Sequence, residues 1–153
     1  MPLDRRRSAV IAYFDTSAIV PLLIDEPLSD LAYRLWRRAS WIATARVSYV
    51  EARAGLARAC RMGRISPQEL RDAVESLELV ERQFHHVEIT PDLVTNAGAL
   101  AEEMALRAYD AIQLAAALSL DIDDVVVVTG DRQLAAAAQA LGLPSLSDPT
   151  TAL

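Results

Sequence analysis

The sequence predicts an α/β fold in which one parallel sheet lies between two layers of helices. Short apolar runs alternate along the 153 residues with longer segments whose apolar residues recur at helical spacing. The clearest strand pattern is "VVVV" at 125–128, which is apolar at every position, as in a parallel strand covered on both faces. The chain has the length of one ordinary domain, so the alternation predicts a single sheet with helices on both sides.

The first half of the chain begins with the strand pattern "VIAYFD". A short helix, an amphipathic helix and the strand "WIATA" follow, and then two long helices. The second of these has a complete start signal, with Ser66 as N-cap, Pro67 at the first helical position and Glu69 closing a capping box. The predicted ranges are a strand at 10–15, helices at 16–24 and 27–39, a strand at 41–45, and helices at 46–64 and 66–84.

The second half repeats the alternation and ends in a weak strand pattern. Pro91 opens one helix, and Gly142 marks the end of another. The predicted ranges are a strand at 86–90, helices at 91–105 and 108–120, a strand at 124–129, a helix at 132–142 and a strand at 143–147. No internal repeat or linker interrupts these segments. We therefore expect residues 1–10 to form a flexible basic tail and residues 11–148 to form one domain.

The composition excludes several classes of function. All fifteen basic residues are arginine, and the absence of lysine excludes a P-loop and Schiff-base chemistry. One cysteine, Cys60, cannot form an internal disulfide or a cysteine metal cluster, which fits a reducing cytoplasm. The two histidines, His85 and His86, are adjacent near a predicted strand, where neighbouring side chains point to opposite faces, so they make a poor zinc site.

Charge and hydropathy limit the partners. The formal net charge of −6 argues against broad electrostatic binding to nucleic acid, although a local groove lined by arginine stays possible. No apolar run approaches the roughly 18 residues that a membrane span needs. We expect a soluble, cytoplasmic protein without a membrane partner.

Two acidic residues follow predicted strands. Asp15 ends the first strand, and Asp131 lies just beyond the valine strand. In an open parallel sheet, ligands bind beyond the carboxyl ends of the strands, so both acids fall where a site is expected. Each could instead cap a helix or interact favourably with its positive end.

Two further acids lie within predicted helices. Glu51 has Val47, Ala54 and Gly55 one turn away, a stripe of small and apolar side chains that we expect to face the sheet. Asp110 has Leu106 and Leu114 four residues to either side. A buried carboxylate needs a cation or hydrogen bonds. The alternative to a functional site is an intramolecular salt bridge to Arg58 or Arg107.

Four carboxylates at one edge of a sheet would repel one another and raise their pKa values unless a cation lay among them. Mg²⁺ prefers oxygen ligands and commonly binds through a few carboxylates together with substrate phosphates. Such a site suits phosphodiester hydrolysis, because the ion lowers the pKa of a water molecule and offsets charge on the leaving oxygen. Ser17 and Thr129 could hold a carboxylate or water in place, or could be helix caps.

The chain resembles the PIN-domain nucleases, and among them the VapC-type ribonuclease toxins of toxin–antitoxin pairs. The resemblance extends from Ala12 to Leu146 and is carried by four segments in family order, "YFDTSAIVPLLIDEP", "VSYVEARAGLARA", "LRAYDAIQLAAAL" and "VVTGDRQLAAAAQALGL". It implies that Asp15, Glu51, Asp110 and Asp131 form an acidic quartet that binds Mg²⁺ or Mn²⁺. It also implies a five-stranded parallel sheet and a homodimer.

The activity implied by this resemblance is endonucleolytic cleavage of RNA by metal-activated water, leaving a 5′-phosphate and a 3′-hydroxyl. We expect Arg53 and Arg58 to contact RNA phosphates. An antitoxin protein is the implied partner. Ordinary packing against the domain's own core accounts for most of the apolar stripes on helices 27–39 and 66–84. If a groove between these helices stays exposed, it would bind an amphipathic antitoxin helix, which could place an arginine among the carboxylates.

Other functions fit less well. A haloacid-dehalogenase type phosphotransferase needs a second acid two residues after the first, where this chain has Ser17, and it also needs a lysine. A receiver domain likewise calls for a lysine. The serious competitor is a catalytically idle PIN-like domain that binds RNA or protein and whose carboxylates hold a structural ion.

Overall fold

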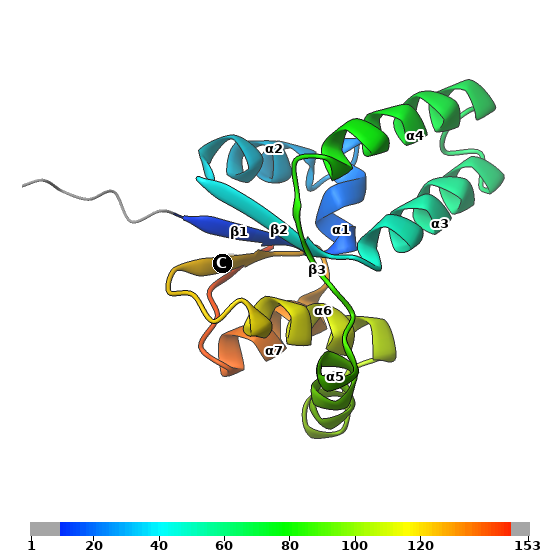
Figure 1. Ribbon diagram of the computed structural model, residues 1–153. Helices are drawn as coiled ribbons and strands as arrows, with labels where there is room; N and C mark the ends of the chain where they lie inside the picture. Colours follow the sequence, from blue (N-terminus) through cyan, green and yellow to red (C-terminus); the bar gives the residue numbers. More distant parts are fainter. Residues whose placement is uncertain (1–9, 148–153) are drawn as a thin grey trace, which may run out of the picture.

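The computed structural model describes residues 10–147, so most of the predicted tail lies outside the described residues. The strands form one parallel five-stranded sheet in the order β3-β2-β1-β4-β5, which confirms the predicted fold class. Figure 1 shows this sheet between two layers of helices. The strands are β1 (Ile11–Phe14), β2 (Trp41–Ala45), β3 (His85–Val87), β4 (Val125–Val128) and β5 (Ser145–Leu146).

The helices follow the predicted order with shorter bounds. The segment predicted as one helix at 16–24 divides into a short α-helix and a 3₁₀ turn that begins beside Pro21, which has no N–H for a helical hydrogen bond. The helices are α1 (Thr16–Ile19), η1 (Val20–Leu22), α2 (Ser29–Arg38), α3 (Ser48–Arg61), α4 (Pro67–Glu81), α5 (Pro91–Met104), α6 (Ala108–Ser119) and α7 (Arg132–Ala140).

The strand predicted at 86–90 is displaced. β3 begins one residue earlier and ends at Val87, because Thr90 accepts a hydrogen bond from the N–H of Leu93 and caps α5 instead. The start of α4 is as predicted, since Ser66 and Glu69 exchange both hydrogen bonds of a capping box.

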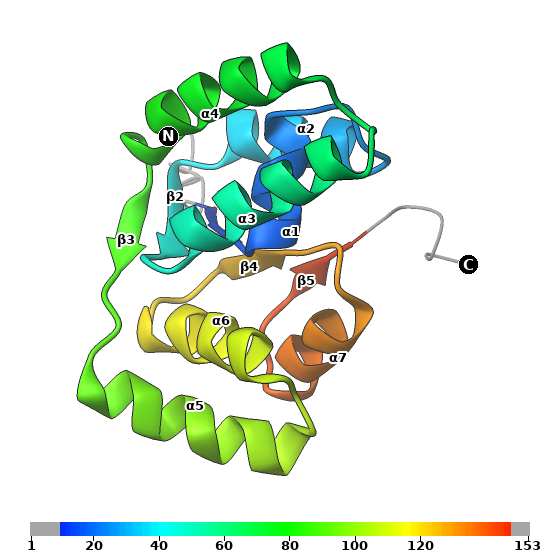
Figure 2. The same ribbon diagram turned by 90° about the vertical axis from the view of Figure 1, so that its right-hand side faces the viewer.

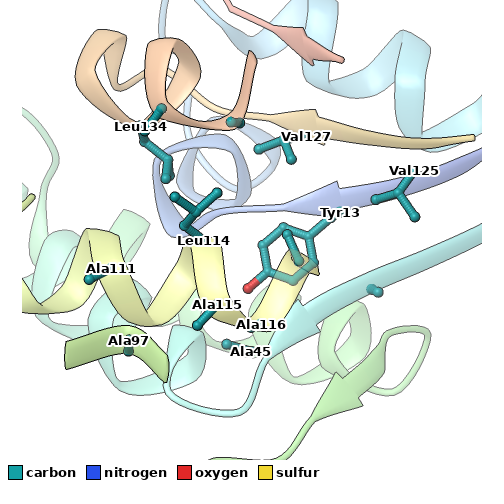
Figure 3. Packing of buried hydrophobic residues seen from close by; sticks show 14 of the residues in the cluster. Tyr13, Ala45, Ala97, Ala111, Leu114, Ala115, Ala116, Val125, Val127 and Leu134 are labelled. Atoms are coloured by element: carbon teal, nitrogen blue, oxygen red, sulfur yellow. The ribbon is translucent and has the colours of Figure 1, made fainter. Parts of the chain in front are cut away.

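Alternate residues of the strands pack against different helices. Ala12 and Phe14 of β1 belong to a core cluster with residues of α1, α2, α3 and α4, whereas Ile11 and Tyr13 face a second cluster. That second cluster, shown in part in Figure 3, joins the sheet to α5, α6 and α7. Figure 2 shows these two groups of helices on opposite sides of the strands. The two faces explain why β1 and β4 are apolar at consecutive positions.

The apolar stripes of helices 27–39 and 66–84 pack largely into the core, as the core-packing alternative predicted. Leu28 and Leu77 are buried, and Trp36 packs edge to face against Phe14 and Phe84, with ring centroids 5.8 and 5.1 Å away. These residues belong to the core because α2 and α4 cover the sheet directly. An apolar hollow opens instead between α3 and α4, lined by Val50, Arg53, Ala54, Ala57, Leu70, Arg71 and Val74.

The α3–α4 hairpin extends away from the sheet in Figures 1 and 2. Its two helices leave this hollow facing outward, and Val50 within it is 64% exposed. No helix within residues 10–147 has the length and apolar character required to cross a membrane.

Candidate functional site

Asp15 lies at the carboxyl end of β1, beside the end of β4. Phe14 pairs with Val128 in the sheet, and the N–H of Asp15 continues the pairing by donating to the Val128 carbonyl at 3.1 Å. The Asp15 side chain is only 5% exposed, and burial raises the pKa of its carboxyl group. Asp15 occupies the N-cap position of α1, but its side chain makes no capping hydrogen bond to that helix.

Two hydroxyl groups hold the Asp15 carboxylate. Ser17 Oγ and Thr129 Oγ1 each donate to its Oδ2 at 2.6 Å, and Thr129 is fully buried. The backbone N–H of Gly130 donates to Ser17 Oγ at 2.7 Å, which ties this hydroxyl to the loop after β4. These hydrogen bonds oppose the rise in the pKa of Asp15 because they favour the ionised carboxylate.

Asp131 lies in the same loop and has a structural task. Its Oδ1 accepts a hydrogen bond of 3.0 Å from the N–H of Leu134, so it is the N-cap of α7, as the capping alternative proposed. Its own N–H donates to Thr129 Oγ1 at 3.0 Å. The capping bond uses one carboxylate oxygen, and the other lies 3.7 Å from Arg107 Nη2.

Asp110 lies in the first turn of α6, opposite Asp131. Its Oδ2 is buried and makes no hydrogen bond, and Arg107 Nε lies 3.5 Å from it. Burial raises the pKa of Asp110, and the charge of Asp131 adds to this effect, whereas Arg107 lowers the pKa. The Arg107 side chain is 80% exposed and lies between Asp110 and Asp131. The salt bridge to Arg107 that the sequence suggested is therefore present, with a separation of 3.5 Å from Asp110.

Glu51 lies in the first turn of α3, at the edge of the core. The predicted stripe is partly wrong, because Ala54 is exposed and the buried face of α3 consists of Ser48, Ala52, Leu56 and Ala59. Glu51 Oε1 accepts a 3.0 Å hydrogen bond from the side-chain amide of Gln113, and the hydroxyl of Thr16 also bonds to its carboxylate. Burial raises the pKa of Glu51, and the charges of Asp15 and Asp110 raise it further.

The four predicted acids therefore interact at one edge of the sheet. Asp110 contributes to the raised pKa values of both Asp15 and Glu51, and Asp131 contributes to that of Asp110. Three features of these acids fit a divalent cation. They offer carboxylate oxygens as ligands, their negative charges repel one another, and Asp110 Oδ2 is buried without a hydrogen bond. As the side chains stand, no three acids, histidines or cysteines within residues 10–147 could hold one ion together. An ion here would depend on fewer direct carboxylates, with water or phosphate oxygens completing its coordination.

A family model described as "PIN domain" matches residues 12–140. The chain belongs to the PIN-domain family. The matched region contains all four acids and runs from β1 to α7. Within the family, the chain is similar to two ribonucleases of Mycobacterium tuberculosis, VapC45 from strain CDC 1551 / Oshkosh and VapC49 from strain ATCC 25618 / H37Rv. Each is 39% identical over 142 residues, covering 91% of this chain and 99% of the relative.

Several solved structures share the fold. PAE2754 from Pyrobaculum aerophilum has a TM-score of 0.65 and 27% sequence identity, covering 90% of this chain and 84% of that one. A toxin–antitoxin complex from Klebsiella pneumoniae has a TM-score of 0.64 and 20% identity, covering 90% of this chain and 97% of that one. At 20% identity, the likeness to the Klebsiella complex shows only that the two proteins share a fold.

Sequence reasoning missed part of this PIN-domain site. Gln113 and Tyr13, which are buried, and Thr16 all contribute to the surroundings of Glu51. The available signal was Gln113 itself, a polar residue within the apolar run "AIQLAAAL" and one turn after Asp110. Of the predicted RNA-binding residues, Arg53 donates to Tyr49 Oη at 2.7 Å on the exposed side of α3, and Arg58 is exposed on the same helix.

Proposed function

We propose that this PIN-domain protein is a divalent-metal-dependent endoribonuclease and the toxin of a toxin–antitoxin pair. The observation that carries the proposal is the meeting of Asp15, Glu51, Asp110 and Asp131 at one sheet edge, with the pKa of the first three raised. Their carboxylate oxygens suit a hard divalent ion, for which we propose Mg²⁺ or Mn²⁺. The 39% identity to two proteins named Ribonuclease VapC supports RNA as the substrate.

The residues would divide the work according to their positions. Asp15, fixed by two hydroxyl groups, and Asp110, with an oxygen free of hydrogen bonds, are proposed as the main ligands. Glu51 and Asp131 are proposed to complete the negative surroundings and to orient water. Ser17 and Thr129 are proposed to hold the Asp15 carboxylate in position and to favour its ionised form by donating hydrogen bonds to it. A bound ion would lower the pKa of a water molecule and offset charge on the leaving oxygen of the RNA.

The experiment is an RNA cleavage assay on the purified protein with Mg²⁺, with Mn²⁺ and with excess EDTA. We expect cleavage only with a metal ion, leaving a 5′-phosphate. Asp15→Asn and Asp110→Asn should each lower the rate by at least about 100-fold, because a neutral amide cannot balance the charge of the ion. Cleavage that persists in EDTA would contradict the proposal.

A catalytically idle binding domain is the second candidate, favoured by the absence, within residues 10–147, of three side chains already arranged around an ion. The same variants separate the two functions. An idle domain would bind RNA and show no cleavage with any divalent ion, and Asp15→Asn would change its stability alone.

For the partner, we propose an antitoxin protein that contacts the hollow between α3 and α4. The hollow has an apolar floor with Arg53 and Arg71 in its lining, so it suits an amphipathic segment carrying acidic residues. The shared fold with a toxin–antitoxin complex is consistent with such a partner. Val74→Asp should weaken binding of an antitoxin encoded beside this protein, with cleavage unchanged. We also propose that the protein is cytoplasmic and forms a homodimer. Sedimentation of the purified protein tests the oligomeric state.

A further inference from the structure

Gln113 links Glu51 to the core of the protein. It lies on α6, one turn after Asp110, and is only 1% exposed. Its side-chain nitrogen lies 2.9 Å from Ser48 Oγ, 3.0 Å from Glu51 Oε1 and 3.3 Å from Thr16 Oγ1. Its side-chain oxygen lies 2.6 Å from the hydroxyl of Tyr13. The amide is thus surrounded by polar groups from β1, α1, α3 and the chain between them.

The orientation of this amide is determined at both ends. Tyr13 is fully buried, and burial raises the pKa of its hydroxyl far above the ordinary value, so it remains a proton donor. The Tyr13 hydroxyl donates to Gln113 Oε1, which leaves the NH₂ group facing Glu51. The opposite orientation would place the amide oxygen 3.0 Å from Glu51 Oε1, where the amide would have no hydrogen to donate to the carboxylate. Figure 3 shows the Tyr13 hydroxyl directed toward α6.

A chain of hydroxyl groups fixes the second hydrogen of the amide. Thr44 Oγ1 lies 2.7 Å from both the Phe14 carbonyl and Ser48 Oγ. Thr44 is the donor in both contacts, so its one proton is shared between the Phe14 carbonyl and Ser48 Oγ. Ser48 Oγ also accepts from the side-chain amide of Gln113. The contacts thus connect Gln113 through Ser48 and Thr44 to Phe14, the residue before Asp15.

We propose that Gln113 is a positioning residue that fixes the Glu51 carboxylate and directs it into the acidic site. Glu51 belongs to α3 and Asp110 to α6, so Gln113 is also the bridge that keeps these two acids in register. A hydrogen bond from a buried amide that Tyr13 and Ser48 also hold restricts the position of the Glu51 carboxylate. This inference rests on the proposed function, because it assigns a role to Gln113 in that site.

The test compares Gln113→Leu with the wild-type protein in Mn²⁺ affinity, measured by titration calorimetry without RNA, and in kcat and KM for RNA. Removing a partner that orients a ligand commonly weakens metal affinity or activity by about 10- to 100-fold. We expect a loss of this size in Mn²⁺ affinity and in kcat, with KM nearly unchanged. Tyr13→Phe should give a smaller loss in the same direction, because the amide remains but is no longer oriented.

Two controls separate positioning from stability. Leu77→Ala removes a buried side chain in the other core cluster, so it should lower the melting temperature while folded protein keeps its Mn²⁺ affinity. Gln113→Leu should cause no further loss when added to Glu51→Gln, since Gln113 acts through Glu51. If Gln113→Leu does not fold, Gln113→Asn replaces it, because the shorter amide cannot reach both Tyr13 and Glu51.

Unchanged Mn²⁺ affinity and kcat in folded Gln113 variants, or losses that multiply in the double variant, would overturn the role of Gln113. The same double-mutant cycle can be measured with free energies of unfolding in urea, with EDTA present. It then gives the interaction energy between Glu51 and Gln113 in the absence of metal. A wild-type protein that shows this coupling but neither binds Mn²⁺ nor cleaves RNA refutes the proposed function. Wild-type cleavage with unaffected variants refutes only the inference on Gln113.

Discussion

Thr129 and Asp15 are 114 residues apart in sequence, yet the Thr129 hydroxyl donates a 2.6 Å hydrogen bond to Asp15 Oδ2. Both residues leave adjacent parallel strands at the same level, because Phe14 of β1 pairs with Val128 of β4. The bond therefore depends on the register of the two central strands, and the aspartate is held by the sheet itself.

Removing this hydroxyl should disturb Asp15 more than it disturbs the fold. We expect Thr129→Val, which keeps the side-chain shape, to lower the free energy of unfolding by about 1 to 3 kcal/mol, since a buried carboxylate loses a donor. Cleavage should fall about 10-fold or more. Thr129→Ser is the matched control and should keep most of the activity. Equal activities of the valine and serine variants, measured with saturating Mn²⁺, would show that the hydroxyl does not act on Asp15.

The clustered acids predict how stability depends on pH without metal. Burial and mutual repulsion raise the folded-state pKa values of Asp15, Glu51 and Asp110 above those of the unfolded chain, which are about 4. Between these two values the folded state binds more protons than the unfolded state. The stability cost of these groups is thus present at neutral pH and is relieved as pH falls through the folded-state pKa values.

Thermal unfolding in EDTA at several pH values tests this dependence with Asp110→Asn as comparison. The variant should be more stable than the wild type at neutral pH, and the difference should shrink in mild acid. A variant less stable than the wild type at neutral pH would mean that the Arg107 interaction outweighs repulsion by Asp131.

Arg107 should compete weakly with a metal ion. Its guanidinium lies 3.5 Å from Asp110 and 3.7 Å from Asp131, but it is 80% exposed, so its effect is screened by solvent. We expect Arg107→Ala to lower the melting temperature in EDTA by at most about 4 °C and to increase the rise in melting temperature caused by Mn²⁺. Arg38→Ala, at the end of α2, serves as the control. An identical response to Mn²⁺ in Arg107→Ala and wild type would exclude the competition.

RNA contact by Arg53 and Arg58 is testable through the salt dependence of binding. If each arginine contacts one phosphate of single-stranded RNA, its replacement by alanine should reduce the slope of log affinity against log salt by about 0.7. Fluorescence anisotropy with Asp15→Asn as the common background measures binding without cleavage. Arg38 is again the matched control, because it lies at the end of α2, near the amino ends of the strands and so away from the acids. There the N–H of Ser40 donates to the carbonyl of Val10, just before β1. An unchanged slope for Arg53→Ala and Arg58→Ala would remove both from the RNA surface.

The sheet and its flanking helices could be predicted from the sequence because their signals are local. The four valines of β4, the capping box of Ser66 and the alternation of segments each arise from neighbouring residues. Where prediction failed, a competing local or tertiary contact decided the outcome. Thr90 caps α5 instead of extending β3, and Pro21 divides the segment that was predicted as one helix at 16–24.

The acids of the site could be predicted because a carboxylate at a strand end or on an apolar helix face conflicts with its local surroundings. Ser17 and Thr129, which hold Asp15, also had a local signal beside the acids, whereas Tyr13 and Gln113 could not be predicted in the same way. Tyr13 reads as an ordinary strand residue, and its bond to Gln113 joins positions 100 residues apart. Hydrogen-bond direction depends on tertiary neighbours, so the network appears only when β1, α3 and α6 are packed together.

The central place of β1 in the sheet has a consequence for the time at which the site forms. β1 is made first, but its neighbour β4 spans Val125–Val128, and the loop carrying Thr129 and Asp131 comes later still. During synthesis, one side of β1 has no partner strand until nearly the whole domain has left the ribosome. The nascent chain therefore carries Asp15 and Glu51 without the hydroxyl and acid that complete their surroundings. The acidic site described above is therefore assembled only when translation of the domain is almost finished.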